Sequence, residues 1–234
     1  MLEIQISQIK MNNTRLEILF EDNHLIAINK KSGDIIQGDK TGDKPLSEIV
    51  KLYIKKKYNK PGNVYLGTIH RIDRPTSGII IFAKTSKALT RMNEKFRNNE
   101  ITKTYWAIVK NMLPRKADNL QNYLIKDQRK NKSFVTKKEN GKHAQLSYRL
   151  IIKLDNYYHY EIQPKTGRHH QIRVQLSYEG SPIKGDLKYG AQRSNKDASI
   201  NLHARKIQFK HPVSKEDFEI TAPPPREKIW DLTN

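Results

Sequence analysis

Short strand-like segments that follow one another in runs most strongly constrain the fold of this chain. The first pair is predicted over residues 15–30, where alternating apolar residues from Leu16 give way to the turn residues Asp22 and Asn23 and an apolar run resumes at Leu25. Further strands are predicted at 79–82, 102–109, 120–125, 144–154, 157–162, 201–209 and 218–221. Three helices are predicted. The first covers 46–58, the second begins at a cap formed by Thr85 or Ser86, and the third is a short stretch after Gly167. Because the strands do not alternate strictly with helices, the predicted class is α+β with a mixed, largely antiparallel sheet and flanking helices.

The charge of the chain predicts an anionic polymer as its partner. Lys and Arg number 44 against 24 Asp and Glu, which gives a formal net charge of +20, and such a field attracts nucleic acid or an anionic membrane surface. The most apolar stretch, Gly78 to Ala83, is far shorter than the roughly 20 residues of a membrane span, so no membrane partner is expected. The N-terminus lacks the hydrophobic region of a secretory signal, which predicts a cytoplasmic location.

Length and cysteine content narrow the architecture and the chemistry. The 234 residues are enough for one large domain, and a single compact domain over residues 1–234 is the default expectation. The sequence contains no cysteine, which excludes disulfides, thiolate nucleophiles and cysteine-ligated metals. Any catalytic group must therefore be a carboxylate, imidazole, hydroxyl or amine.

One segment concentrates the positive charge. Between residues 128 and 153 the only acidic residue is Glu139. The basic residues there are Arg129, Lys130, Lys132, Lys137, Lys138, Lys142, Arg149 and Lys153. Such a run can be a solvated hairpin, but in a chain this basic throughout, contact with phosphates is the favoured interpretation.

The segment from His70 to Gly78 carries the clearest chemical signal. It places Asp73 between Arg71 and Arg74, directly before the apolar strand at 79–82. Flanking arginines favour the ionised carboxylate, which can act as a nucleophile or a base. The same residues can also form an ion pair that only fixes the loop, so this segment alone leaves both interpretations open.

Two further segments favour the catalytic interpretation. Residues 164–173 form a glycine turn that opens a helix with basic side chains, which suits a phosphate group. Residues 103–107 place the aromatic ring of Tyr105 and the cation of Lys103 on one face of a strand.

Together these segments resemble the motifs of the RluA-type pseudouridine synthase family. The loop from His70 to Gly78 is similar to the catalytic loop of that family, and the strand from Lys103 to Val109 to the one that bears its active-site tyrosine. The other matching blocks follow in the family's order at 18–30, 166–176, 180–186, 189–190 and 202–204. The resemblance implies the family's catalytic fold with a central cleft, in a single domain without an N-terminal S4-like domain. Lys31 and Gln175 depart from the residues usual in the family, proline and histidine.

The resemblance also implies roles for eight residues. Asp73 would be the catalytic aspartate, Tyr105 would stack on the target uracil, and Arg173 would pair with Asp73. Leu202 would pack against the base pocket, and Arg71 would enter the space left by the flipped nucleotide. The remaining residues expected to support the site or contact the RNA are Lys30, Arg74 and Arg168.

The implied reaction breaks the N1 glycosidic bond of uridine, rotates the uracil and joins C5 to the same ribose carbon. It is an isomerisation without redox change, so no cofactor and no metal is expected. The expected partner is structured RNA, either ribosomal or transfer RNA, and the expected state is a monomer. Extruding the base costs a few kcal/mol, which stacking on Tyr105 and phosphate contacts would offset.

Two other functions are consistent with parts of the sequence. The first is a basic RNA-binding module that keeps the fold but lacks turnover, although binding alone does not require a carboxylate in an anion-attracting surface. The second is a metal-dependent nuclease that uses His70, Asp73, His169 and His170. Adjacent histidines on a helix point in different directions, and no HExxH pattern accompanies them.

Overall fold

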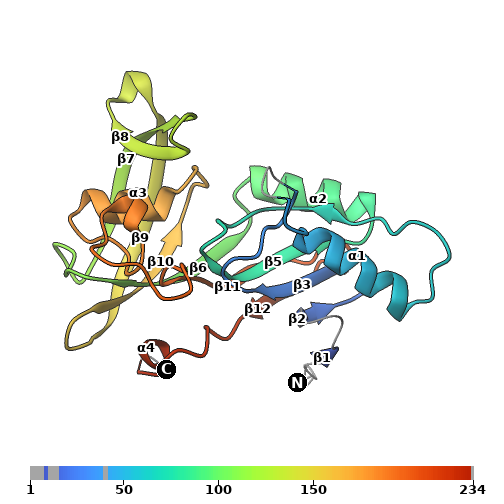
Figure 1. Cartoon of the computed structure of the whole chain (residues 1–234). Helices are drawn as coiled ribbons and strands as arrows, with labels where there is room; N and C mark the ends of the chain where they lie inside the picture. The colour runs from blue at the N-terminus through green and yellow to red at the C-terminus, as the bar shows by residue number, and fades with distance from the viewer. Residues whose placement is uncertain (1–7, 10–15, 39–41, 233–234) are drawn as a thin grey trace. The chain divides into compact units, whose positions relative to one another are not determined.

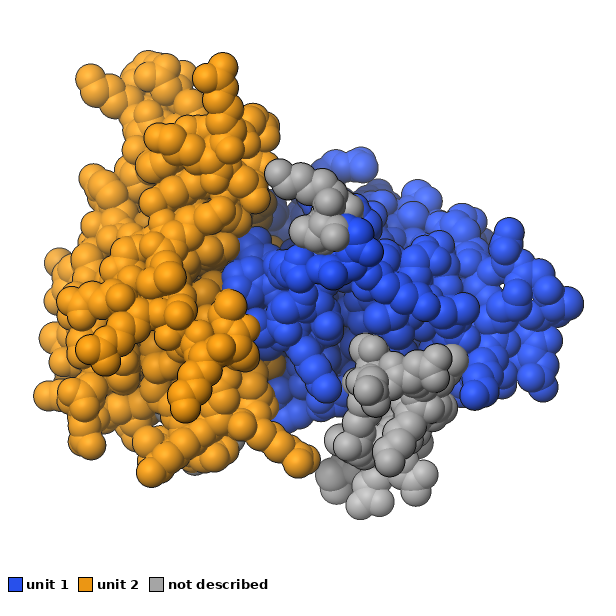
Figure 2. Space-filling view, in the orientation of Figure 1, with its two compact units in different colours: residues 1–101, 206–223 blue, residues 102–205, 224–234 orange. Residues whose placement is uncertain are grey.

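A computed structural model describes residues 8–9, 16–38 and 42–232 (Figure 1). The chain divides into two compact units, which Figure 2 shows in different colours. Unit 1 comprises residues 1–101 and 206–223, and unit 2 comprises residues 102–205 and 224–234. The sequence predicted one domain over residues 1–234, and it stays a prediction that the two units act together as one catalytic domain.

Unit 1 is a sheet with two helices. Its elements are β1 (Gln8–Ile9), β2 (Leu16–Glu21), β3 (Leu25–Lys30), α1 (Leu46–Lys57), β4 (Gly67–Thr68), β5 (Ser77–Ala83), α2 (Ser86–Arg97), β12 (Asp217–Thr221) and the end of β11 (Leu202–Lys210). The strand order is β1-β2-β3-β5-β11, with β4 paired to β5 and β12 paired to β11. The predicted first hairpin and the predicted helices after residues 46 and 85 are confirmed, and Thr85 caps α2 by accepting the N–H of Ala88 at 3.2 Å.

Both faces of β5 are covered, which explains why all of its residues are buried. Ile79 and Ile81 pack in a cluster with Ala88 and Met92 of α2. The alternate residues of β5 pack in a second cluster with Val50 and Ile54 of α1. Successive side chains of a strand point to opposite faces of a sheet, so α1 and α2 cover opposite faces (Figure 1). The loop that carries Asp73 therefore leads into the most completely buried strand of this unit.

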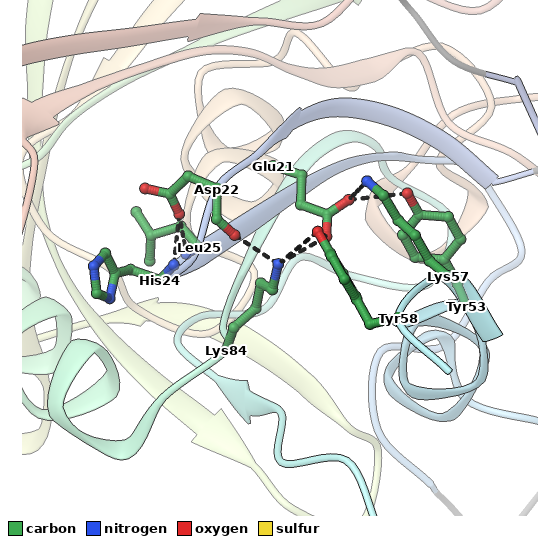
Figure 3. Close-up of polar contacts among 8 residues, drawn as sticks. All are labelled: Glu21, Asp22, His24, Leu25, Tyr53, Lys57, Tyr58 and Lys84. Carbon is green, nitrogen blue, oxygen red and sulfur yellow. Dashed lines mark hydrogen bonds and ion pairs between the residues drawn. The ribbon is translucent and has the colours of Figure 1, made fainter. Parts of the chain in front are cut away.

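A partly buried carboxylate joins the end of β2 to the end of α1 (Figure 3). Glu21 accepts hydrogen bonds from Tyr53 at 2.9 Å and from Lys57 at 2.7 Å. Its other oxygen accepts from Tyr58 at 2.9 Å and from Lys84 at 2.7 Å. Burial raises the pKa of Glu21, but these four hydrogen bonds outweigh it and lower the pKa from 4.5 to about 2. Glu21 thus joins the end of α1 to the end of β2 and to Lys84, which follows β5.

Unit 2 contains a second sheet and the helix that follows Gly167. Its elements are β6 (Thr102–Val109), β7 (Ala117–Asp127), β8 (Lys132–Thr136), η1 (Lys138–Asn140), β9 (Lys142–Lys153), β10 (Tyr158–Pro164), α3 (Gln171–Tyr178), η2 (Leu187–Tyr189), the start of β11 and α4 (Lys228–Asp231). The strand order is β11-β6-β10-β9-β7-β8. The pairs β6–β10, β10–β9, β9–β7 and β7–β8 are all antiparallel.

The core of unit 2 lies between this sheet and α3. Ala107 and Val109 of β6 share a cluster with Ile172 and Leu176 of α3, and Tyr105 packs against it. Trp106 lies on the other face of β6 against His159, with ring centroids 4.9 Å apart. Strand β8 was not predicted. It lies in the basic segment 128–153, where the charge pattern indicates a solvated hairpin or a phosphate-binding surface but not the position of this strand.

Within the described part of the chain, no helix is both long and apolar enough to cross a bilayer.

Candidate active site

In unit 1, the loop that carries Asp73 is tied to the end of β3 by a buried lysine. Lys30 is 1% exposed, and its Nζ donates to the carbonyl oxygens of Lys31 at 2.8 Å, Arg74 at 3.1 Å and Thr76 at 2.8 Å. An ammonium group has three N–H donors, so the three carbonyls account for all of them. The resemblance left open whether Lys30 supports the site or contacts RNA, and this burial favours the supporting role.

Burial lowers the pKa of Lys30 from 10.5 to about 8, and the carboxylates of Asp34 and Asp73 oppose this effect. Burial raises the pKa of Asp34, whose carboxylate accepts the N–H of Lys31 at 3.3 Å. The negative charge of Asp73 raises the pKa of Lys30, and the Arg74 carbonyl that Lys30 contacts belongs to the residue directly after Asp73. Lys30 therefore acts on the loop through hydrogen bonds and through charge.

Main-chain contacts hold the same loop on both sides of Asp73. The N–H of Thr76 donates to the carbonyl of Asp73 at 3.0 Å, which closes a tight turn. The N–H of Gly33 donates to the carbonyl of Arg74 at 2.9 Å, and the hydroxyl of Ser32 donates to the carbonyl of Pro75 at 3.1 Å. Backbone bonds of this kind fix a loop without using its side chains. Asp73, which is partly exposed, is thus carried on a rigid turn.

His70 also serves this loop. Its Nε2 accepts the N–H of Ile81 at 3.1 Å, and its ring stacks on Phe96 with centroids 5.1 Å apart. This use of Nε2 fits a histidine that fixes a loop by hydrogen bonding. Among the described residues, no group of three or more His, Cys, Asp and Glu side chains could hold a metal ion.

The two arginines beside Asp73 are both exposed. Arg74 forms an ion pair with Asp43, with Nη2 and Oδ2 2.5 Å apart and both side chains about half exposed. Exposed pairs of this kind contribute little stability, roughly 0–1 kcal/mol, so the pair leaves Arg74 able to exchange Asp43 for a phosphate. The exposure of Arg71 and Arg74 is consistent with the predicted RNA contacts.

In unit 2, β6 and β11 present Tyr105 and Leu202. Tyr105 is partly exposed and packs against the core of the unit, while Leu202 is 4% exposed and belongs to that core. Both therefore lie on the face of the sheet that α3 covers. Their predicted contacts with a uracil stay predictions.

Arg173 of α3 has a buried carboxylate partner that the sequence did not suggest. Its Nε donates to Oδ2 of Asp186 at 2.7 Å and its Nη2 donates to Oδ1 at 2.9 Å. Arg173 is 5% exposed and Asp186 is 1% exposed. The guanidinium carbon also lies 5.0 Å from the ring centre of Tyr189. The predicted pairing of Arg173 with Asp73 stays a prediction, because those residues belong to different units.

The turn before α3 is bound to β8, the first strand of the basic segment from Arg129 to Lys153. Ser133 of β8 hydrogen bonds to Nδ1 and to the carbonyl of His169, each at 2.8 Å, and the rings of His169 and His170 stack with centroids 3.8 Å apart. Arg168 is exposed and its Nε donates to the carbonyl of His143 at 2.8 Å. These contacts give the predicted phosphate-binding turn a fixed place beside the strands that carry the excess of lysine.

The structure thus groups the predicted site residues into two sets. Unit 1 holds Lys30, Arg71, Asp73 and Arg74, and unit 2 holds Tyr105, Arg168, Arg173 and Leu202. Sequence reasoning missed Asp186 and Tyr189 as functional candidates, although both lie in blocks that match the family. The available signal was that Asp186 is an acidic residue shortly after the helix that carries Arg173. No local sequence pattern, however, pairs residues 173 and 186.

The sequence of this chain is similar to those of known pseudouridine synthases. The sequence profile of the family described as RNA pseudouridylate synthase matches residues 24–178. The ribosomal large subunit pseudouridine synthase D of Borreliella burgdorferi is 31% identical over 220 residues, which are 92% of this chain and 67% of that protein. The synthase C of Buchnera aphidicola subsp. Acyrthosiphon pisum is 35% identical over 88% of this chain and 66% of its own length. The chain thus spans about two thirds of the length of these relatives.

Two solved structures share the fold. Human RNA Pseudouridylate Synthase Domain Containing 4 aligns with a TM-score of 0.77 and 23% identity over 92% of this chain and 91% of that chain. Human RNA Pseudouridylate Synthase Domain Containing 1 aligns with a TM-score of 0.70 and 21% identity over 93% of this chain and 87% of that chain. The chain belongs to the RNA pseudouridylate synthase family, whose members are isomerases. The predicted family and the predicted α+β fold are confirmed.

Proposed function

We propose that this protein converts uridines of structured RNA to pseudouridine, with Asp73 as the catalytic carboxylate. The observation that supports this most directly is the loop from His70 to Ser77, which holds Asp73 on a turn fixed by the ammonium of Lys30 and by backbone bonds. A rigid carboxylate is what the reaction requires, because nucleophilic attack and proton abstraction both depend on its placement.

Ribosomal RNA is the proposed substrate class. The two relatives described above carry names that refer to the ribosomal large subunit, and transfer RNA is the second class to compare. The proposed location is the cytoplasm. The proposed oligomeric state is a monomer. Size-exclusion chromatography with light scattering would test the oligomeric state.

The other assignments follow from the family and fit the local structure. Tyr105 would stack on the uracil, Leu202 would line the base pocket, and Arg173 would keep Asp73 charged and oriented. Stacking on an aromatic ring contributes about 1–3 kcal/mol per base, which is comparable with the cost of flipping a base. Arg71, Arg74 and Arg168 are exposed and would contact the RNA.

The main RNA-contacting surface is proposed to be the basic hairpin region from Arg129 to Lys153. It includes all of β8 and all of β9, and Lys132, Lys142 and Arg149 lie on these strands. Each lysine or arginine that neutralises a phosphate releases counterions, so binding should weaken steeply as salt increases. Replacing Lys137 and Lys138 with Gln should make the salt dependence of binding less steep, whereas an unchanged slope would place the RNA elsewhere.

The test of the proposed function is release of tritium from RNA labelled at C5 of uridine. When C5 becomes bonded to the ribose carbon in place of N1, C5 loses its hydrogen to solvent and N1 gains one. Wild type should release tritium from large-subunit ribosomal RNA or from transfer RNA, and Asp73→Asn should release none while still binding the RNA. Asp217→Asn is a matched control, because Asp217 is an exposed carboxylate of unit 1 that pairs with Lys210.

The same experiment separates the proposal from its main alternative. Tight, salt-sensitive binding without release by wild type would support a non-catalytic RNA-binding module. Release by Asp73→Asn at the wild-type rate would refute the role of Asp73. Arg173→Met should lose most of its turnover, and near-normal turnover would count against its predicted pairing with Asp73.

A further inference from the structure

Arg173 lies in a buried cluster with Asp186 and Tyr189. A residue that only supplied a positive charge to Asp73 would not need these two additional contacts. Arg173, Asp186 and Tyr189 are each no more than 5% exposed. Removing two opposite charges from water costs several kcal/mol per ion, and a buried pair often contributes no net stability compared with apolar residues of the same size. A role in stability is therefore a weak explanation for this pair.

The geometry of the pair fixes the direction of the guanidinium group. The two bonds to Asp186 join Nε and Nη2 to the two carboxylate oxygens, an arrangement that sets the plane of the guanidinium. The ring of Tyr189 lies 5.0 Å from the guanidinium carbon and restricts the same group by contact. With the plane fixed, Nη1 points in one direction only.

Asp186 is itself held by its main chain. Its N–H donates to the carbonyl of Ile183, and its carbonyl accepts the N–H groups of Tyr189 and Ala191, each at 3.0 Å. Gly185 precedes it with a φ of +88°, and an added Cβ there would meet the carbonyl oxygen of Ser199 at 2.6 Å. The carboxylate therefore stands on a turn with little freedom to move.

Tyr189 has a second set of contacts at its hydroxyl end. The oxygen accepts the N–H of Ser133 in β8 at 2.8 Å and hydrogen bonds to Nδ1 of His170 at 2.9 Å. Lys132 also places its Nζ 5.0 Å from the centre of the ring. One side chain thus contacts both Arg173 and the hairpin proposed to bind RNA.

We infer that Asp186 and Tyr189 are positioning residues for the pseudouridine synthase reaction: Asp186 and the ring of Tyr189 orient Arg173, and the hydroxyl of Tyr189 holds the β7–β8 hairpin in place. This inference rests on the proposed function, since it concerns the arginine expected to pair with Asp73. It separates the two ends of Tyr189, because the ring should serve turnover and the hydroxyl should serve RNA binding.

The first test compares kcat and KM for tritium release by Asp186→Asn, Arg173→Met and the double variant. Asp186→Asn should lower kcat about 10²-fold, as expected for a misplaced catalytic partner, with KM changed less than about threefold. The double variant should be no slower than Arg173→Met, because Asp186 acts through Arg173. A wild-type kcat in Asp186→Asn, or a further loss in the double variant, would overturn the inference. Asp118→Asn, which breaks an exposed ion pair with Arg115, is the control.

Folding is checked separately, because Asp186→Asn leaves a buried arginine without its carboxylate. The variant Asp186→Glu keeps the charge but displaces the carboxylate by one methylene. If Asp186→Glu unfolds at the wild-type urea concentration and still has a low kcat, positioning is supported. If both Asp186 variants lose activity only in proportion to the fraction unfolded, the pair is structural and the inference is wrong.

The second test separates the two ends of Tyr189. Tyr189→Phe keeps the ring and should keep kcat within about threefold while raising KM several-fold, whereas Tyr189→Leu removes the ring and should also lower kcat about tenfold. Tyr160→Phe is a matched control, since the Tyr160 hydroxyl likewise accepts a buried backbone N–H, that of Leu113 at 3.0 Å. Equal kcat in Tyr189→Phe and Tyr189→Leu would refute the role of the ring.

A failure of this inference can be distinguished from a failure of the proposed function. If wild type releases no tritium from any RNA, the proposed function is wrong and this inference falls with it. If wild type is active and Asp186→Asn is equally active, only this inference is refuted.

Discussion

His159 should make this protein lose stability in mild acid. The side chain lies on β10 and is fully buried, with its ring 4.9 Å from that of Trp106 and 5.8 Å from that of Trp230. Neither ring nitrogen has a hydrogen-bond partner among the described residues. Burial lowers the pKa of His159 from 6.5 to about 4.

The magnitude follows from the difference between the two pKa values. Above pH 6.5 the imidazole is neutral in both the folded and the unfolded chain, and the group has no effect on stability. As the pH falls below 6.5 only the unfolded chain takes up the proton, so the free energy of unfolding falls until the folded form is protonated near pH 4. A gap of about 2.5 pKa units at about 1.4 kcal/mol each corresponds to a loss of about 3 kcal/mol, of which about 2 kcal/mol is already lost at pH 5.

The assay is urea unfolding of wild type and His159→Met at pH 7, 5 and 4. The variant should show a free energy of unfolding that falls less with acid than that of wild type, by about 3 kcal/mol over the full range. His143→Gln, which removes a partly exposed histidine of β9, should follow the wild-type curve. Parallel curves for wild type and His159→Met would show that His159 is not kept neutral by burial, and the reasoning would be refuted.

Three further variants test other buried contacts. Lys30→Met removes the donor to three loop carbonyls and should lower the free energy of urea unfolding by about 3 kcal/mol and tritium release by at least tenfold; wild-type release would show that Asp73 does not depend on Lys30. Glu21→Gln should lower the free energy of unfolding by about 2 kcal/mol at pH 7. Because the pKa of Glu21 is lowered to about 2, the difference from wild type should shrink as pH falls from 4.5 towards 2. A difference that stays constant with pH would show that the stabilisation does not come from the ionised carboxylate. Gly185→Ala should lower the melting temperature, because its Cβ would meet the carbonyl of Ser199 at 2.6 Å, and an unchanged melting temperature would show that this turn can relax.

The order and type of the main elements follow from the sequence because they depend on local patterns. Alternation of apolar residues predicted β2, an apolar run after a turn predicted β3, and helical spacing predicted α1. A capping residue at position 85 or 86 predicted the start of α2. The charged strand β8 was missed because it is an edge strand of five residues whose stability comes from pairing with β7 and from contacts with the turn before α3. Tertiary contacts there override a weak local signal.

Some features of the candidate site can likewise be recognised in the sequence, and others are visible only in the structure. The sequence by itself determined the family and the expected roles of Asp73, Tyr105 and Arg173, since motif residues and their order along the chain need no structure to be recognised. Only the tertiary structure showed that Lys30 is buried under the loop of Asp73, and that Arg173 is held by Asp186. Burial and long-range pairing join residues that are distant in the chain, 44 positions apart for Lys30 and Arg74. No local pattern encodes such a pair, because the sheet and helix that bring its members together form only when the whole unit folds.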